Sequence, residues 1–68
     1  MYEITKKEFK SDDNVVYTSY GIISKSDNII IDDICCDYNR FVKWVNNLNK
    51  LNLSTIHIFD AVNDFLAQ

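Results

Sequence analysis

The chain has 68 residues, which is enough for one small domain and too few for two. Hydrophobic residues make up 47% of it and aromatic residues 13%, a composition too apolar for a disordered chain. The net charge of −3 disfavours general electrostatic binding to nucleic acid, and no apolar run approaches the roughly 20 residues that span a bilayer. The first residues lack the apolar stretch of a signal peptide, so we expect one cytoplasmic domain over residues 1–68.

The first half of the sequence has the composition of strands. Runs rich in β-branched and aromatic residues, over 2–10, 15–25 and 28–35, are separated by polar clusters at 11–14 and 25–28. Two turns this short join neighbouring strands as hairpins, and they therefore predict an antiparallel three-stranded meander.

Glycine and proline are nearly absent from this chain. It contains eight Asn, one Gly and no Pro, so we expect Asn and Asp to occupy the turn positions with positive φ. The single glycine, Gly21, falls in the middle of the second predicted strand, where it weakens the strand. Its presence there predicts either a β-bulge or an aromatic ring packed on bare backbone.

The second half of the sequence has helical periodicity. Asp37 and Ser54 are good N-cap residues, and apolar side chains recur with a 3.6-residue period over 38–51 and 55–66. The predicted fold class is α+β: a three-stranded antiparallel meander followed by two helices (β-β-β-α-α) packed on one face of the sheet. We expect the second helix to pack centrally, and its apolar residues there are Phe59, Val62, Phe65 and Leu66.

Part of this pattern resembles a known family. A Tyr20-Gly21-Ile22 strand precedes Asp33-Ile34, Asp37 and a C-terminal helix of the form L-S-x-x-H-I-x-D-x-V-x-D-F-L over residues 53–66. In this ordering the chain resembles a small uncharacterised family from clostridia and related Firmicutes, classified as a domain of unknown function. The resemblance covers about residues 17–66 and implies a source and a fold, but no activity. The adjacent Cys35 and Cys36 depart from the family's pattern.

The residues that could carry metal or catalytic chemistry are few. They are His57, Cys35, Cys36, Asp32, Asp33, Asp37 and Asp60. None has the paired spacing of a structural zinc site, and no glycine-rich loop accompanies a nucleophile. We also expect a chain this short to leave little room for a ligand pocket of about 300 Å³. We therefore predict no enzyme activity and no catalytic, cofactor-binding or metal-binding residue, with both thiols reduced and inert.

The surplus of apolar residues on the helices is more informative. The two apolar arcs span about 180° and about 160°, more than the roughly 100° that one buried face requires. Trp44 lies on the flank of the first arc beside Arg40, and both residue types are common at the energetic centres of interfaces. We predict that Trp44 is partly exposed and binds a partner. Four acidic residues complete the predicted partner-binding set, namely Asp60, Asp64, Asp32 and Asp33.

These observations predict a small non-enzymatic cytoplasmic regulator or adaptor that binds a protein, which includes a second copy of the same chain. The alternative is an acidic inhibitor, encoded by a phage or mobile element, that blocks a nucleic-acid-handling host enzyme. Its contact surface would be residues 27–37, which contain four aspartates. A third reading, phosphate-backbone contact by Arg40, Lys43 and Lys50, is disfavoured by the small number of cations and the acidic remainder of the chain.

Overall fold

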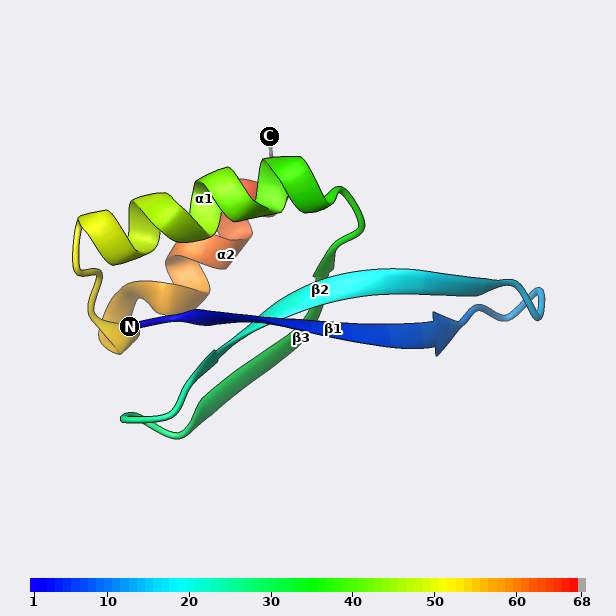
Figure 1. Cartoon of the computed structure of the whole chain (residues 1–68), viewed down its shortest axis with the longest axis horizontal. Helices are drawn as coiled ribbons and strands as arrows, with labels where there is room; N and C mark the ends of the chain where they lie inside the picture. The colour runs from blue at the N-terminus through cyan, green and yellow to red at the C-terminus, as the bar shows by residue number, and fades with distance from the viewer. Residues whose placement is uncertain (68) are drawn as a thin grey trace.

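The computed structural model of the protein describes residues 1–67. Its elements are β1 (Glu3–Lys10), β2 (Val16–Ser24), β3 (Ile29–Cys35), α1 (Tyr38–Lys50), the 3₁₀ turn η1 (Thr55–His57) and α2 (Ile58–Leu66). The strands form one antiparallel sheet in the order β1-β2-β3, and the two helices lie on one side of it (Figure 1). The predicted α+β arrangement is confirmed. Within residues 1–67 no helix has the length and apolar surface that crossing a bilayer demands.

Asparagine and aspartate take the turn positions that glycine usually occupies. In residues 1–67 the positive-φ residues are Asn14, Asn28, Asp33 and Asn52, with φ between 53° and 62°. Asn14 closes the turn between β1 and β2, and Asn28 precedes β3. Their short polar side chains tolerate the left-handed conformation at lower cost than other non-glycine residues. The expectation drawn from the shortage of glycine is therefore confirmed.

The lone glycine marks a bulge. Tyr20 of β2 pairs with Cys35 of β3, whereas Ile22 pairs with Ile31, so β3 carries extra residues opposite Gly21. A Cβ atom at Gly21 would overlap the carbonyl oxygen of Ile31 and lie 2.9 Å from the Cα of Asp32. The β3 backbone thus approaches too closely for any side chain. Of the two predicted explanations for Gly21, the bulge is correct.

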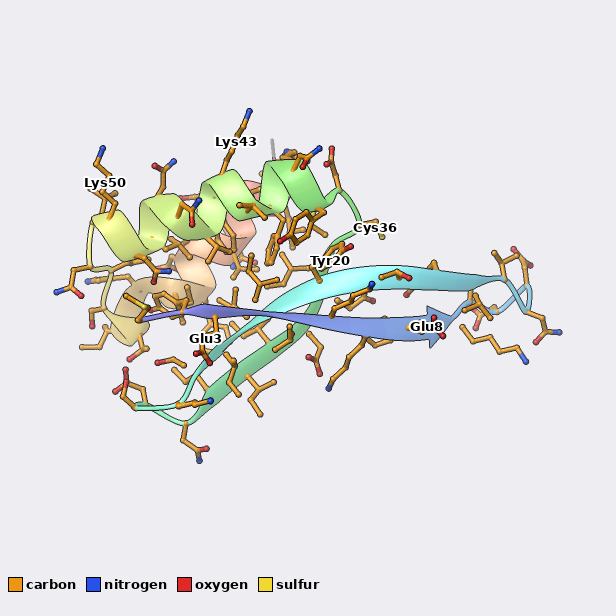
Figure 2. The ribbon with its side chains drawn as sticks, in the orientation of Figure 1. Glu3, Glu8, Tyr20, Cys36, Lys43 and Lys50 are labelled. Carbon is orange, nitrogen blue, oxygen red and sulfur yellow. The ribbon has the colours of Figure 1, made fainter. Side chains whose placement is uncertain are left out.

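The core lies between the sheet and the helices, and both helices contribute to it. Phe41 of α1, Ile58 of α2 and Ile22 of β2 are each 0% exposed. The other buried hydrophobic residues are Tyr2, Ile34, Val45, Leu48, Val62 and Phe65. Tyr20 points from the sheet toward α1 (Figure 2), and its ring centroid lies 6.4 Å from that of Phe41.

The prediction that Phe59 and Leu66 belong to this core is wrong. Their side chains are 61% and 58% exposed. The first turn of the predicted helix is the 3₁₀ turn η1, and the buried line of α2 begins only at Ile58. Phe59 and Leu66 are seven residues apart and lie about 100° around the helix from that line, so they face solvent. The buried stripe of α2 is consequently narrower than its apolar arc.

The ends of β1 and β2 project beyond the helices. Residues 16–19 of β2 pair with β1 alone, and this two-stranded ribbon extends past the start of α1 (Figure 1). The molecule measures 38 × 25 × 18 Å, with a radius of gyration of 12.3 Å. A compact chain of this length would have a radius of gyration of about 11 Å. We refer to this ribbon, residues 7–10 and 16–19 with their turn, as the hairpin arm.

The other end of β1 is fastened to α1. The side-chain oxygen of Asn49 accepts the backbone N–H of Tyr2 at 2.7 Å, and its amide group donates to the Tyr2 carbonyl at 3.0 Å. The Tyr2 hydroxyl donates to the carbonyl of Leu53 at 3.0 Å. One asparagine therefore satisfies both backbone groups of Tyr2 and fixes the sheet against the end of α1.

Replacement of Gly21 by Ala should destabilise the protein by at least about 2 kcal/mol, because the added methyl group meets β3 backbone rather than a flexible side chain. Urea denaturation followed by circular dichroism measures this loss. Val16→Ala in the same strand is the control, since Val16 is 60% exposed and its truncation should change stability by under about 0.5 kcal/mol. Equal stability of the two variants would contradict the bulge.

The two helix caps should each contribute about 1 kcal/mol to stability. Asp37 accepts the backbone N–H of Arg40 at 3.3 Å, and the Ser54 hydroxyl accepts that of Ile56 at 3.3 Å. Asp37→Ala and Ser54→Ala each leave one of these donors without its acceptor. Thermal melts should show a midpoint several degrees lower for each variant, and an unchanged midpoint would mean that the cap is not formed in solution.

Candidate functional site

The candidate site is a hollow of about 520 Å³ on the surface formed by α1 and α2. Its lining consists of Asp37, Asn39, Arg40, Lys43, Trp44, Asn47 and Phe65. All but Phe65 come from α1 or its cap, at the 3- and 4-residue spacing that places side chains on one helical face. The sequence predicts little room for a pocket of about 300 Å³, and the hollow exceeds that volume because it opens at the surface rather than inside the core.

Trp44 forms the aromatic floor of the hollow. Its ring stacks on Phe65 of α2 with 4.7 Å between centroids, and lies 5.5 Å from the ring of Phe41. The side chain is half-buried, as predicted for a residue on the flank of the α1 apolar arc. Contacts with two core rings hold the indole in one position, while its remaining surface borders the hollow. The result is a rigid aromatic surface that a partner could cover.

Arg40 is held beside Trp44 by contacts with the same phenylalanine. Its guanidinium carbon lies 4.6 Å from the centre of the Phe65 ring, and Nη2 donates to the Phe65 carbonyl at 3.4 Å. That carbonyl belongs to the last turn of α2, where a cation also interacts favourably with the helix dipole. Arg40 is nevertheless exposed, so its charge stays available at the rim of the hollow.

The electrostatic character of α1 is uniformly positive. The helix contains Arg40, Lys43 and Lys50 and no acidic residue. Lys43 and Lys50 extend away from the sheet (Figure 2), and neither forms an ion pair within residues 1–67. The site is therefore an aromatic floor with a cationic rim, carried by a protein whose net charge is negative.

The predicted acidic residues lie in two other places. Asp32 and Asp33 are on β3, where Asp32 pairs with Lys7 at 3.0 Å and Asp33 accepts the Tyr17 hydroxyl at 3.1 Å. The hydrogen bond to Asp33 raises the pKa of Tyr17 above its ordinary value. Both carboxylates thus make contacts within the sheet and are not part of the hollow.

Asp60 and Asp64 lie on α2, the helix that also carries Phe65. Both are exposed, and neither contributes to the lining of the hollow. Of the six predicted partner-binding residues, the structure therefore brings Trp44 and Arg40 together and leaves these two on the neighbouring helix. The sequence pattern predicts Phe65 only as a core residue and does not predict Asn47 as part of the site. The spacing of Arg40, Trp44 and Asn47 along one helical face was the available signal for Asn47.

The candidate ligands for metal or nucleophilic chemistry do not converge. His57 is exposed at the start of α2, and Cys36 is exposed in the connection before α1. Cys35 donates its S–H to the Asp37 carbonyl at 3.5 Å. Among residues 1–67 there is no group of three His, Cys, Asp or Glu side chains able to hold a metal ion.

Comparison of the chain with known protein families, with curated proteins and with solved structures gives no match. The resemblance to the clostridial family stays a prediction. The function must therefore be inferred from the geometry of the hollow and the two helices.

The double variant Cys35→Ser, Cys36→Ser should keep the fold and lose only a small amount of packing free energy, because neither thiol lines the hollow. Circular dichroism and urea denaturation check the fold, and calorimetric titration with the partner checks binding. A folded variant that no longer binds would instead give the thiols a redox or metal role.

Proposed function

We propose that this protein is a small non-enzymatic cytoplasmic regulator or adaptor that binds a protein partner through the α1–α2 hollow. The observation that carries the proposal is Trp44, fixed between Phe41 and Phe65 with its free surface beside Arg40. Tryptophan and arginine are the residue types that most often concentrate binding energy at protein interfaces. Because the indole is already immobilised by the core, little side-chain entropy is lost when a partner covers it.

The chemistry of the lining favours binding over catalysis. Its one carboxylate, Asp37, accepts a backbone N–H at the start of α1, and the lining includes no His, Cys or Ser to act as a base or nucleophile. Asparagine amides and two cations instead provide hydrogen-bond donors around an aromatic surface. This mixture of groups is typical of the rim and centre of a protein interface.

The alternative of an acidic inhibitor has less support. Its proposed contact, residues 27–37, depends on carboxylates that a host enzyme would bind in place of phosphates. Asp32, Asp33 and Asp37 are each already engaged, with Lys7, Tyr17 and the backbone of Arg40 respectively. Only Asp27 of the four has no such contact among the described residues.

Replacement of Trp44 by Ala should weaken partner binding by at least about 2 kcal/mol, or roughly thirtyfold in Kd. The partner is first captured from host extract by the immobilised protein, and its affinity for wild type and variants is then measured by calorimetry. Phe59→Ala is the matched control. Phe59 is an exposed aromatic residue of α2 outside the hollow, so its truncation should leave Kd unchanged.

A second variant separates binding from folding, because Trp44 also packs against two core rings. Asn47 is exposed and lines the hollow, and arginine is a good helix former. Asn47→Arg should therefore keep native stability while filling the hollow, and should raise Kd at least about tenfold. Unchanged affinity in both variants would place the binding surface elsewhere on the molecule.

A further inference from the structure

The two helices carry charges of opposite sign. Among its thirteen residues α1 has three cations and no acid, whereas α2 has Asp60 and Asp64 and no cation. All five charged residues are exposed. Their separation onto two neighbouring helices makes the outer side of the helical layer half positive and half negative.

Within residues 1–67 these five charged side chains form no ion pair. The ion pairs of the described residues join Lys7 to Asp32 and Lys25 to Glu3, and both lie on the sheet and its turns. Arg40 contacts the ring and carbonyl of Phe65 rather than a carboxylate. The cations of α1 and the carboxylates of α2 are therefore free to pair with groups outside the chain.

The two helices run in opposite directions, and this determines which charged residues of α1 lie beside which charged residues of α2. Arg40, near the start of α1, touches Phe65, near the end of α2. Asp64 accordingly lies at the same end of the helix pair as Arg40 and Lys43, and Asp60 lies nearer the end that carries Lys50. Trp44 and the hollow lie between the positive and the negative helix.

A two-fold rotation about an axis parallel to the helices lays each α1 across the other copy's α2. In that arrangement the Lys43 end of one α1 meets the Asp64 end of the opposite α2, and the Lys50 end meets the Asp60 end. Both Trp44 rings come to lie inside the contact, with complementary charges around them. Such a surface complements itself, as the contact of a symmetric dimer must.

We propose that the partner fitted by this surface is a second copy of the chain, associated through the outer face of α1 and α2. This proposal rests on the proposed function, because the second copy would cover the same Trp44 surface and is the partner that binds there. Nucleic acid would match only the positive helix and would be repelled by Asp60, Asp64 and the net charge of −3. A second copy of the chain, by contrast, pairs its carboxylates with the cations of α1 and its cations with the carboxylates of α2.

The test exchanges charges and measures self-association by sedimentation equilibrium. Wild type should dimerise reversibly between about 10 µM and about 1 mM, more weakly as salt is raised. Lys43→Glu with Lys50→Glu gives two acidic helices, and Asp60→Lys with Asp64→Lys gives two basic ones. Each double variant alone should show a dimer dissociation constant at least about tenfold higher than wild type. Mixed together they should form a heterodimer, because each acidic helix then meets a basic one.

The matched control is Lys6→Glu with Lys10→Glu. It changes the net charge as much as the α1 double variant does, but on exposed residues of β1. It should dimerise like wild type. A control as weak as the α1 variant would show that net charge and not helix pairing governs association. A mixture that stays monomeric would overturn the helix pairing itself.

Failure of this proposal can be told apart from failure of the proposed function. A monomeric wild type that still binds a host protein through Trp44 would overturn the dimer alone. A dimer that follows the charge exchange but is unaffected by Trp44→Ala and Asn47→Arg would leave the helix pairing in place and overturn the role of the hollow. A monomer that binds a labelled single-stranded DNA through Lys43 and Lys50 would overturn the dimer in favour of the nucleic-acid reading.

Discussion

The position of one buried ring, that of Phe41, determines how the other parts of the molecule meet. It is fully buried, and its centroid lies 6.4 Å from that of Tyr20 in the sheet and 6.0 Å from that of Phe65 in α2. Trp44 lies against both Phe41 and Phe65, so the floor of the surface hollow is the outermost layer of the core. In a domain this small, the candidate binding surface and the hydrophobic core share side chains. A substitution in the core therefore also alters the binding surface, and a substitution in the binding surface also alters the packing of the core.

Features with a local physical cause could be predicted from the sequence. The asparagines at positive φ, the caps Asp37 and Ser54, and the helical periods each depend on a few neighbouring residues. The bulge could also be inferred, since a glycine within a strand needs a reason and few are available. Trp44 and Arg40 could be placed together because they lie four positions apart on one helix, which puts them on adjacent turns.

Features that depend on distant parts of the chain could not be predicted. The amide side chain of Asn49 satisfies the backbone of Tyr2, 47 residues away, and nothing in either neighbourhood indicates that pairing. The pairing of Asp32 with Lys7 depends on the register of β1 and β2 and on the bulge in β3. The helical periodicity of residues 55–66 predicts an apolar arc. Which part of that arc is buried depends on how α2 packs against α1 and the sheet, and in that packing Phe59 faces solvent.

The hairpin arm has a consequence for how the molecule opens. Its backbone pairing joins only β1 and β2, and side chains alone connect it to β3, in the contacts Lys7–Asp32, Tyr17–Asp33 and Ser19–Cys35. Its tip exposes Val15 and Val16, each 60% accessible. Within it Phe9 stacks on Tyr17, with 5.7 Å between the ring centroids. An isolated two-stranded hairpin is only marginally stable in water. We therefore expect the outer part of the arm to open before the rest of the domain, so that its amide protons exchange with solvent while those around Ile22 and Phe41 stay protected until the whole domain unfolds.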